Sequence, residues 1–124
     1  MKKETKKYKP QNAKVQSWDE IEKHFTEWFS GTYVDNLAKL VGHIKSSGLS
    51  QRLFGYISMN KLIVSIYNPI EWNREALHIE FDKQNQNWYF KYYPKPNEKV
   101  EFERKYELKM GIEKFEKFIE MMKW

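Results

Sequence analysis

The sequence predicts a single α+β domain with two N-terminal helices, an antiparallel sheet of about five strands arranged as a meander, and a C-terminal helix. Apolar residues recur with the 3.6-residue period of a helix up to Gly48 and again after Gly111. Between these segments they alternate with the two-residue period of a strand. The links between the strand-like runs are too short for the crossovers that parallel strands need. We therefore expect the helices to cover one face of an antiparallel sheet.

The first helix is expected to begin at Ser17, because Ser17 and Glu20 have the spacing of a capping box. It should run to about Ser30 and stop at Gly31. Its apolar stripe consists of Ile21, Phe25, Trp28 and Phe29.

The second helix is expected to start with the same spacing at Thr32 and Asp35 and to extend up to Gly48. Its buried face is predicted to contain Val34, Leu37, Ala38, Val41 and Ile44. The C-terminal helix follows Gly111, and its apolar stripe consists of Ile112, Phe115, Phe118, Ile119, Met121 and Met122.

Five runs between these helices alternate as strands do, and polar or turn-forming links separate them. They are residues 52–58, 61–67, 75–82, 88–93 and 99–108. Met59 and Asn60 are expected to form a tight turn between the first two runs. Asn68 and Pro69 are expected to end the second run.

The two sets of alternate residues in these runs differ in character, which predicts one covered and one open sheet face. The apolar set is Leu62, Val64, Ile66, Leu77, Ile79, Phe81, Trp88, Phe90, Tyr92, Val100, Phe102 and Tyr106. The polar set is Ser65, Tyr67, His78, Glu80, Asp82, Tyr89, Lys91, Tyr93, Glu101, Glu103 and Lys105. The open face should therefore carry tyrosine side chains.

The composition is that of one globular domain with a basic extension. The chain has 124 residues, of which 40% are hydrophobic, 31% are charged and 17% are aromatic, enough for one core. Six of its 22 basic residues but only one of its 17 acidic residues lie within residues 1–16, so residues 17–124 carry 16 of each. We expect residues 1–16 to be a flexible lysine-rich tail and residues 17–124 to be the domain.

Several classes of protein are disfavoured by the same sequence. There is no cysteine, which excludes disulfides and thiolate metal sites. No apolar run reaches the roughly 18 to 20 residues of a membrane helix, and none follows the basic start, so we expect a cytoplasmic protein. Nucleophile elbows, P-loops, dinucleotide fingerprints and HExxH motifs are absent. We expect no enzymatic activity and no cofactor.

The nearest approach to a reactive or metal-binding cluster is His78, Glu80 and Asp82 on one strand face. Neighbouring members are roughly 7 Å apart along the strand, and no second cluster is placed to converge on them. We interpret them as a solvated strand face and expect no metal. His24 and His43 stand alone on different predicted helices.

Two binding hypotheses remain. In the first, the chain is a small non-catalytic module that binds a partner protein through the aromatic sheet face or a loop. A compact, cysteine-free α+β domain has the general character of many small bacterial inhibitor and immunity proteins. The candidate binding residues are Tyr67, Trp72, Arg74, His78, Tyr89, Lys91 and Tyr93.

In the second hypothesis, the chain binds single-stranded nucleic acid. Tyr89, Lys91 and Tyr93 would stack bases, while the tail would contact phosphates through Lys2, Lys3, Lys6, Lys7 and Lys9. The acidic residues on the same face and a total of only three arginines in the chain argue against it. Protein binding is therefore the favoured hypothesis.

Overall fold

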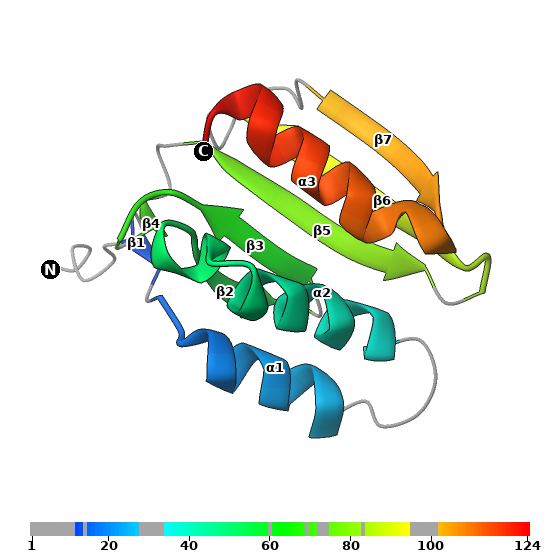
Figure 1. Ribbon diagram of the computed structural model, residues 1–124, viewed down its shortest axis with the longest axis horizontal. Helices are drawn as coiled ribbons and strands as arrows, with labels where there is room; N and C mark the ends of the chain where they lie inside the picture. Colours follow the sequence, from blue (N-terminus) through cyan, green and yellow to red (C-terminus); the bar gives the residue numbers. More distant parts are fainter. Residues whose placement is uncertain are drawn as a thin grey trace, which may run out of the picture.

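The structure, a computed structural model, describes residues 12–13, 15–27, 34–59, 61–68, 70–71, 75–82, 84–94 and 102–124. Three helices pack on one side of a five-stranded antiparallel sheet (Figure 1). The predicted α+β class, with two N-terminal helices and one C-terminal helix, is confirmed. Within these residues, no helix is long and apolar enough to cross a membrane.

Helix α1 (Trp18–Glu27) begins at the predicted capping box. The Glu20 amide donates to Ser17 Oγ (3.0 Å), and the Ser17 amide donates to Glu20 Oε1 (3.2 Å). This arrangement satisfies two donors that a helix start otherwise leaves free. Residues 28–33, where we predicted the end of this helix and the start of the next, lie outside the described residues.

Helix α2 (Val34–Ser46) packs beside α1 on the sheet (Figure 1). Most of its predicted stripe is buried, and Leu40, which the prediction omitted, is buried completely. A helix that contacts both a sheet and a second helix buries a wider arc than one stripe. The buried side chains are Leu37, Leu40, Val41 and Ile44.

The sheet is a meander, as predicted. Its strand order is β2-β3-β5-β6-β7, and every neighbouring pair is antiparallel. The strands are β2 (Phe54–Ser58), β3 (Lys61–Ser65), β5 (Ala76–Asp82), β6 (Asn87–Tyr93) and β7 (Phe102–Glu107). A separate pair, β1 (Asn12–Ala13) with β4 (Ile70–Glu71), was not predicted, because two residues are too few to show alternation.

Short 3-10 helices shorten two of the predicted strands. The amides of Arg52 and Leu53 donate to the Leu49 carbonyl (3.0 and 2.9 Å), because these residues close the 3-10 helix Leu49–Gln51. Strand β2 therefore begins at Phe54. At the other end of the sheet, the 3-10 helix Leu108–Met110 follows β7 and leads directly into α3 (Gly111–Met122).

Helix α3 covers the β6 and β7 end of the sheet (Figure 1). Met121, which we predicted to widen the buried stripe, is instead 58% exposed. It lies at the rim of the buried arc, where β7 is the last strand and no further element continues the layer in the described part of the chain. The buried side chains of this helix are Phe115, Phe118 and Ile119.

The core between α3 and the sheet is largely aromatic. Edge-to-face ring contacts, with centroids 5.1, 6.3 and 5.2 Å apart, connect Phe81 to Trp88, Trp88 to Phe90 and Phe90 to Tyr106. Each such pair contributes about 0.5 to 1.5 kcal/mol beyond the area that it buries. This end of the domain is therefore held by ring geometry as well as by burial.

The fold begins earlier in the chain than the predicted boundary at Ser17. The Gln16 amide donates to the Gly55 carbonyl (2.9 Å), and Gln16 Oε1 accepts from the Ile57 amide (2.8 Å). Trp18 Nε1 donates to the Leu53 carbonyl (3.0 Å). These bonds cover the outer edge of β2. The polar composition of residues 1–16 does not predict them, because the same polar residues could equally belong to a flexible tail. Residues 1–11 lie outside the described residues.

Two tryptophans lie so close to glycines that no larger residue fits. A Cβ atom at Gly111 would be 2.3 Å from Trp88 Cε2, whose ring is also held by a hydrogen bond from Nε1 to the Leu108 carbonyl (2.8 Å). A Cβ atom at Gly55 would be 2.8 Å from Trp18 Cη2. Both glycines are therefore required by packing.

We predict that Gly111→Ala lowers the free energy of unfolding by about 1 to 3 kcal/mol, the usual cost of forcing extra volume into a packed core. The matched control is Gly42→Ala, in the middle of α2, where the new Cβ meets only the flexible Glu22 carboxylate at 3.4 Å. Better helix propensity should make this control neutral or more stable by up to about 1 kcal/mol. Urea unfolding followed by circular dichroism measures both. A Gly111→Ala variant as stable as the control would contradict the packing.

Candidate protein-binding face

The open face is the side of the sheet opposite the three helices (Figure 1). Cross-strand pairing arranges its side chains in rows. One row runs through Tyr56, Ile63, His78, Lys91 and Glu103. The part on β5, β6 and β7 contains most of the predicted site. Below, "open face" means this part: His78, Glu80, Tyr89, Lys91, Tyr93, Glu103 and Lys105.

The aromatic run of β6 divides between the two faces as predicted. Trp88, Phe90 and Tyr92 are buried against the helices, with exposures of 2%, 0% and 7%. Tyr89 and Tyr93 alternate with them and are partly exposed on the open face. The Lys105 ammonium lies 5.9 Å from the centroid of the Tyr89 ring, close enough for a cation–π contact.

His78 lies opposite Lys91, which separates Tyr89 from Tyr93 on this face of β6, and it is neutral near pH 7. Its ring centroid is 4.4 Å from that of Tyr93. Burial foremost, together with the positive charges of Lys61 and Lys91, lowers the pKa of His78 to about 4. The imidazole therefore offers a flat, uncharged surface beside the tyrosine.

Charges of both signs surround the aromatic side chains. Lys61 Nζ is 3.6 Å from Glu80 Oε2, and Lys91 is directly opposite Glu103 on the neighbouring strand. Such partly solvated pairs contribute little to stability. They do determine the electrostatic character of the face, which is mixed and close to neutral.

Asp82 has a structural role at the end of β5. Its Oδ1 accepts from the Gln84 amide (3.0 Å), and its Oδ2 accepts from Asn85 Nδ2 (2.8 Å). These hydrogen bonds, that from the Asn85 side chain foremost, hold the pKa of Asp82 below its usual value. Asp82 therefore stabilises the β5–β6 turn.

The described residues contain no group of three or more histidine, aspartate or glutamate side chains that could hold a metal ion. The His78 ring contacts the Tyr93 ring in a tilted arrangement, while Glu80 pairs with Lys61. His43 contacts Glu116 of α3. With Asp82 bonded to Gln84 and Asn85, the three members of the predicted cluster, His78, Glu80 and Asp82, each have a separate partner.

The β3 end of the same sheet side is closed, which corrects one prediction. Ser65 was expected on the open polar face, but it is fully buried and donates to the Glu75 carbonyl (3.0 Å). Ile63 and Ala76, on the same side, are only 2% and 7% exposed. Burial also raises the pKa of the Tyr56 phenol. No role was assigned to Tyr56 or Ile63 from the sequence. A tight turn after Ser58 would have paired Tyr56 with Ile63, but the position of Ile63 opposite His78 depends on the separate register of β3 against β5.

Among the remaining predicted site residues, Tyr67 is described, and it is not brought into the open face. The Tyr67 hydroxyl donates to Glu75 Oε1 (2.9 Å), and the other oxygen of that carboxylate accepts from Tyr92, a residue of the helix side (2.7 Å). Trp72 and Arg74 lie outside the described residues, as do Glu101 and the tail lysines.

An apolar hollow of about 300 Å³ lies on the helix side, at the start of β7. It has no charged lining side chain among the described residues, so it offers no acid, base or ligand for chemistry. It is lined by Tyr92, Phe102, Phe118, Met121 and Met122.

Comparison of the chain with protein-family models, curated protein sequences and solved structures finds no match. The function must therefore be inferred from the open face itself.

We predict that His78 makes folding less stable in acid. The unfolded histidine binds a proton near pH 6.5 and the folded one only near pH 4, so stability is unaffected above pH 6.5 and is lost as the pH falls towards 4. The full loss is at most about 3 kcal/mol. Urea unfolding at pH 7 and pH 4.5 should show a smaller acid loss for His78→Gln than for the wild type. An NMR titration of the His78 ring with a midpoint above pH 6 would contradict this account.

Proposed function

We propose that the chain is a small non-catalytic domain that binds a partner protein through the open face. The observation that carries the proposal is the pair of partly exposed tyrosines, Tyr89 and Tyr93, on a sheet face that no described helix covers. Tyrosine is among the residues enriched at protein interfaces, because it combines a large apolar ring with a polar hydroxyl at low entropic cost.

The scaffold supports this role because it fixes the tyrosines before a partner arrives. Both side chains project from β6, a central strand paired on both sides along most of its length. Contact with the His78 ring further limits the movement of the Tyr93 side chain, and contact with Lys105 limits that of Tyr89. Side chains held in place in this way lose little freedom on binding, which favours affinity.

The charge pattern favours a protein over a nucleic acid. Lysines on this sheet side are balanced by carboxylates in the same rows, so no continuous positive surface follows the strands. Nucleic-acid binding depends mainly on such a surface. The cations are Lys61, Lys91 and Lys105, and the anions are Glu80, Asp82, Glu103 and Glu107.

A blocking role of the inhibitor or immunity type is consistent with this surface. Such a role requires a rigid patch that covers a partner's site, and it does not require chemistry in the domain itself. His78 is neutral near pH 7 and Glu80 is engaged by Lys61, so neither is prepared for proton transfer in the free domain. The domain would act by occupying its partner's surface.

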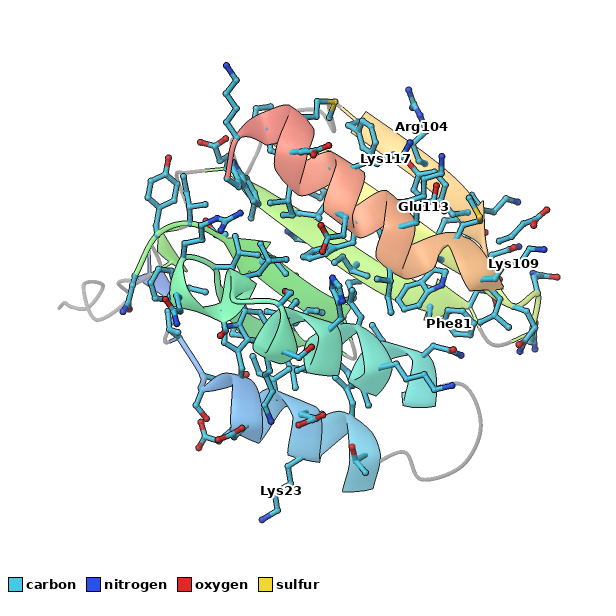
Figure 2. All side chains as sticks on the ribbon, viewed as in Figure 1. Lys23, Phe81, Arg104, Lys109, Glu113 and Lys117 are labelled. Atoms are coloured by element: carbon cyan, nitrogen blue, oxygen red, sulfur yellow. The ribbon has the colours of Figure 1, made fainter. Side chains whose placement is uncertain are left out.

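We predict that Tyr89→Ala combined with Tyr93→Ala weakens partner binding by about 2 to 4 kcal/mol while sparing the fold, since interface anchors each contribute about 1 to 2 kcal/mol. The partner is first captured with the tagged wild-type chain, with and without nuclease, and then purified. Isothermal titration calorimetry measures its affinity for each variant. The matched control, Lys23→Ala with Lys117→Ala, changes exposed side chains of α1 and α3 on the helix side (Figure 2).

The nucleic-acid hypothesis predicts a different result. Capture would be lost after nuclease treatment, and deletion of residues 1–11 would reduce both affinity and its salt dependence. If the double tyrosine variant binds the purified partner protein as tightly as the wild type does, the open face is not the interface. The segment around Trp72 and Arg74 would then be the next candidate.

A further inference from the structure

The two edges of the sheet are treated differently by the rest of the chain. At β2, hydrogen bonds from Gln16 and Trp18 occupy the outward backbone groups of Leu53, Gly55 and Ile57. At β7, the opposite edge, no described strand or loop pairs with the outer side (Figure 1). Covering of this kind normally prevents an edge from pairing with another chain. Only one edge has it within the described residues.

The outer side of β7 offers regularly spaced hydrogen-bonding groups. In an antiparallel ladder, a residue directs its N–H and C=O to the same neighbouring strand, and the next residue directs both the other way. Half of the six residues of β7 therefore present these groups away from β6. A strand of suitable sequence can pair with them.

We propose that the occupant of this edge is a second copy of the chain, whose β7 pairs antiparallel with the first about a twofold axis at Arg104. A twofold axis normal to the sheet keeps the helices of both copies on one side, so residues of the same face must lie opposite each other. The two five-stranded sheets would then join into one continuous sheet.

The charge pattern of β7 favours this register over one centred on Lys105. With Arg104 on the axis, Glu103 of each copy lies opposite Lys105 of the other, and Phe102 lies opposite Tyr106. Both types of cross-strand pair are attractive, and each occurs twice. Shifting the axis to Lys105 would instead place Glu103 opposite Glu107 twice, which is repulsive.

The cost of bringing two Arg104 side chains to the axis is reduced by their position. The Arg104 guanidinium lies 4.7 Å from the centroid of its own Phe102 ring, and its Nη1 donates to the Glu103 carbonyl (2.9 Å). The positive charge of Arg104 is therefore partly engaged by groups of its own strand. The side chain is also exposed, so water screens the remaining repulsion.

Exposed apolar side chains flank the same edge. Among the described residues, the large hydrophobic side chains that remain exposed are Met59, Leu108 and Met121. Leu108 directly follows β7, and Met121 lines the apolar hollow together with Phe102 of β7. Two of the three thus lie at the ends of the strand that would pair. Contact with a second copy would remove apolar surface there from water.

The test is the oligomeric state of the full chain and of two charge reversals, Glu103→Lys and Lys105→Glu, by sedimentation velocity from micromolar to millimolar concentration. The wild type should associate reversibly into dimers. Each single reversal makes both cross-copy charge pairs repulsive, so its dissociation constant should rise by at least about tenfold.

An equimolar mixture of the two single variants provides the decisive arm. In a mixed dimer, the lysine introduced at position 103 meets the glutamate introduced at position 105, and the unchanged Lys105 meets the unchanged Glu103. The mixture should therefore dimerise more tightly than either single variant does alone. The double reversal in one chain should also restore the dimer. Because Glu103 is opposite Lys91 in its own sheet, circular dichroism melts check that each variant is folded.

The matched control is Lys23→Glu, which makes the same charge change as Lys105→Glu but on α1, far from β7 (Figure 2). It should leave the dissociation constant within about twofold of the wild type, because well-separated exposed charges are screened. A wild type that stays monomeric throughout the concentration range would overturn the proposal. Dimers that persist unchanged in the single variants, or that neither mixing nor the double reversal restores, would also overturn it.

Discussion

The register of β5 against β6 is the constraint on which the core and the open face both depend. Seven pairs, from Ala76 with Tyr93 to Asp82 with Asn87, place Ile79 opposite Phe90 towards the helices and Glu80 opposite Tyr89 on the other side. Because side chains alternate, a slip of one residue would exchange the two faces and bury charge in the core. The Asp82 carboxylate fixes the turn that sets this register, and the left-handed conformation of Gln86 (φ 56°) completes it. One turn thus links local chemistry to the whole sheet.

The same register connects stability with the proposed function. Side chains that point to the helices are held by ring contacts and by the Trp88 hydrogen bond, so β6 is a rigid support. Because Tyr89 and Tyr93 project from the same strand, the packing on its helix side also holds their backbone in place. Lys61 and Lys91, which add to the larger effect of burial in lowering the pKa of His78, also balance the carboxylates of the face. A flat, mixed-charge aromatic surface on a rigid sheet suits a protein partner. If β7 pairs with a second copy, the surface becomes continuous across two domains.

Local patterns in the sequence predict what depends on local geometry. The capping box at Ser17 and Glu20, the alternation of β6 and the helical stripe of α3, except for Met121, were predicted correctly because each follows from local spacing along the backbone. Features that depend on distant contacts were not predicted. Ser65 has the polarity of an exposed residue and is buried, while Gln16 has the composition of a tail and caps β2. The close packing of Trp88 against Gly111 was also not predictable, because no pattern in the sequence around either residue indicates that the fold brings them together.

The division of the aromatic run between two faces can be tested most directly without a partner. Oxidative footprinting with hydroxyl radicals, read by mass spectrometry residue by residue, reports which side chains of the folded chain reach water. The account predicts that Tyr89 and Tyr93 are modified readily, while Trp88 and Tyr92, exposed by only 2% and 7%, are protected until the protein unfolds. Modification of Tyr92 at the same rate as Tyr89, or protection of both Tyr89 and Tyr93 in the free monomer, would contradict the register and the open face together.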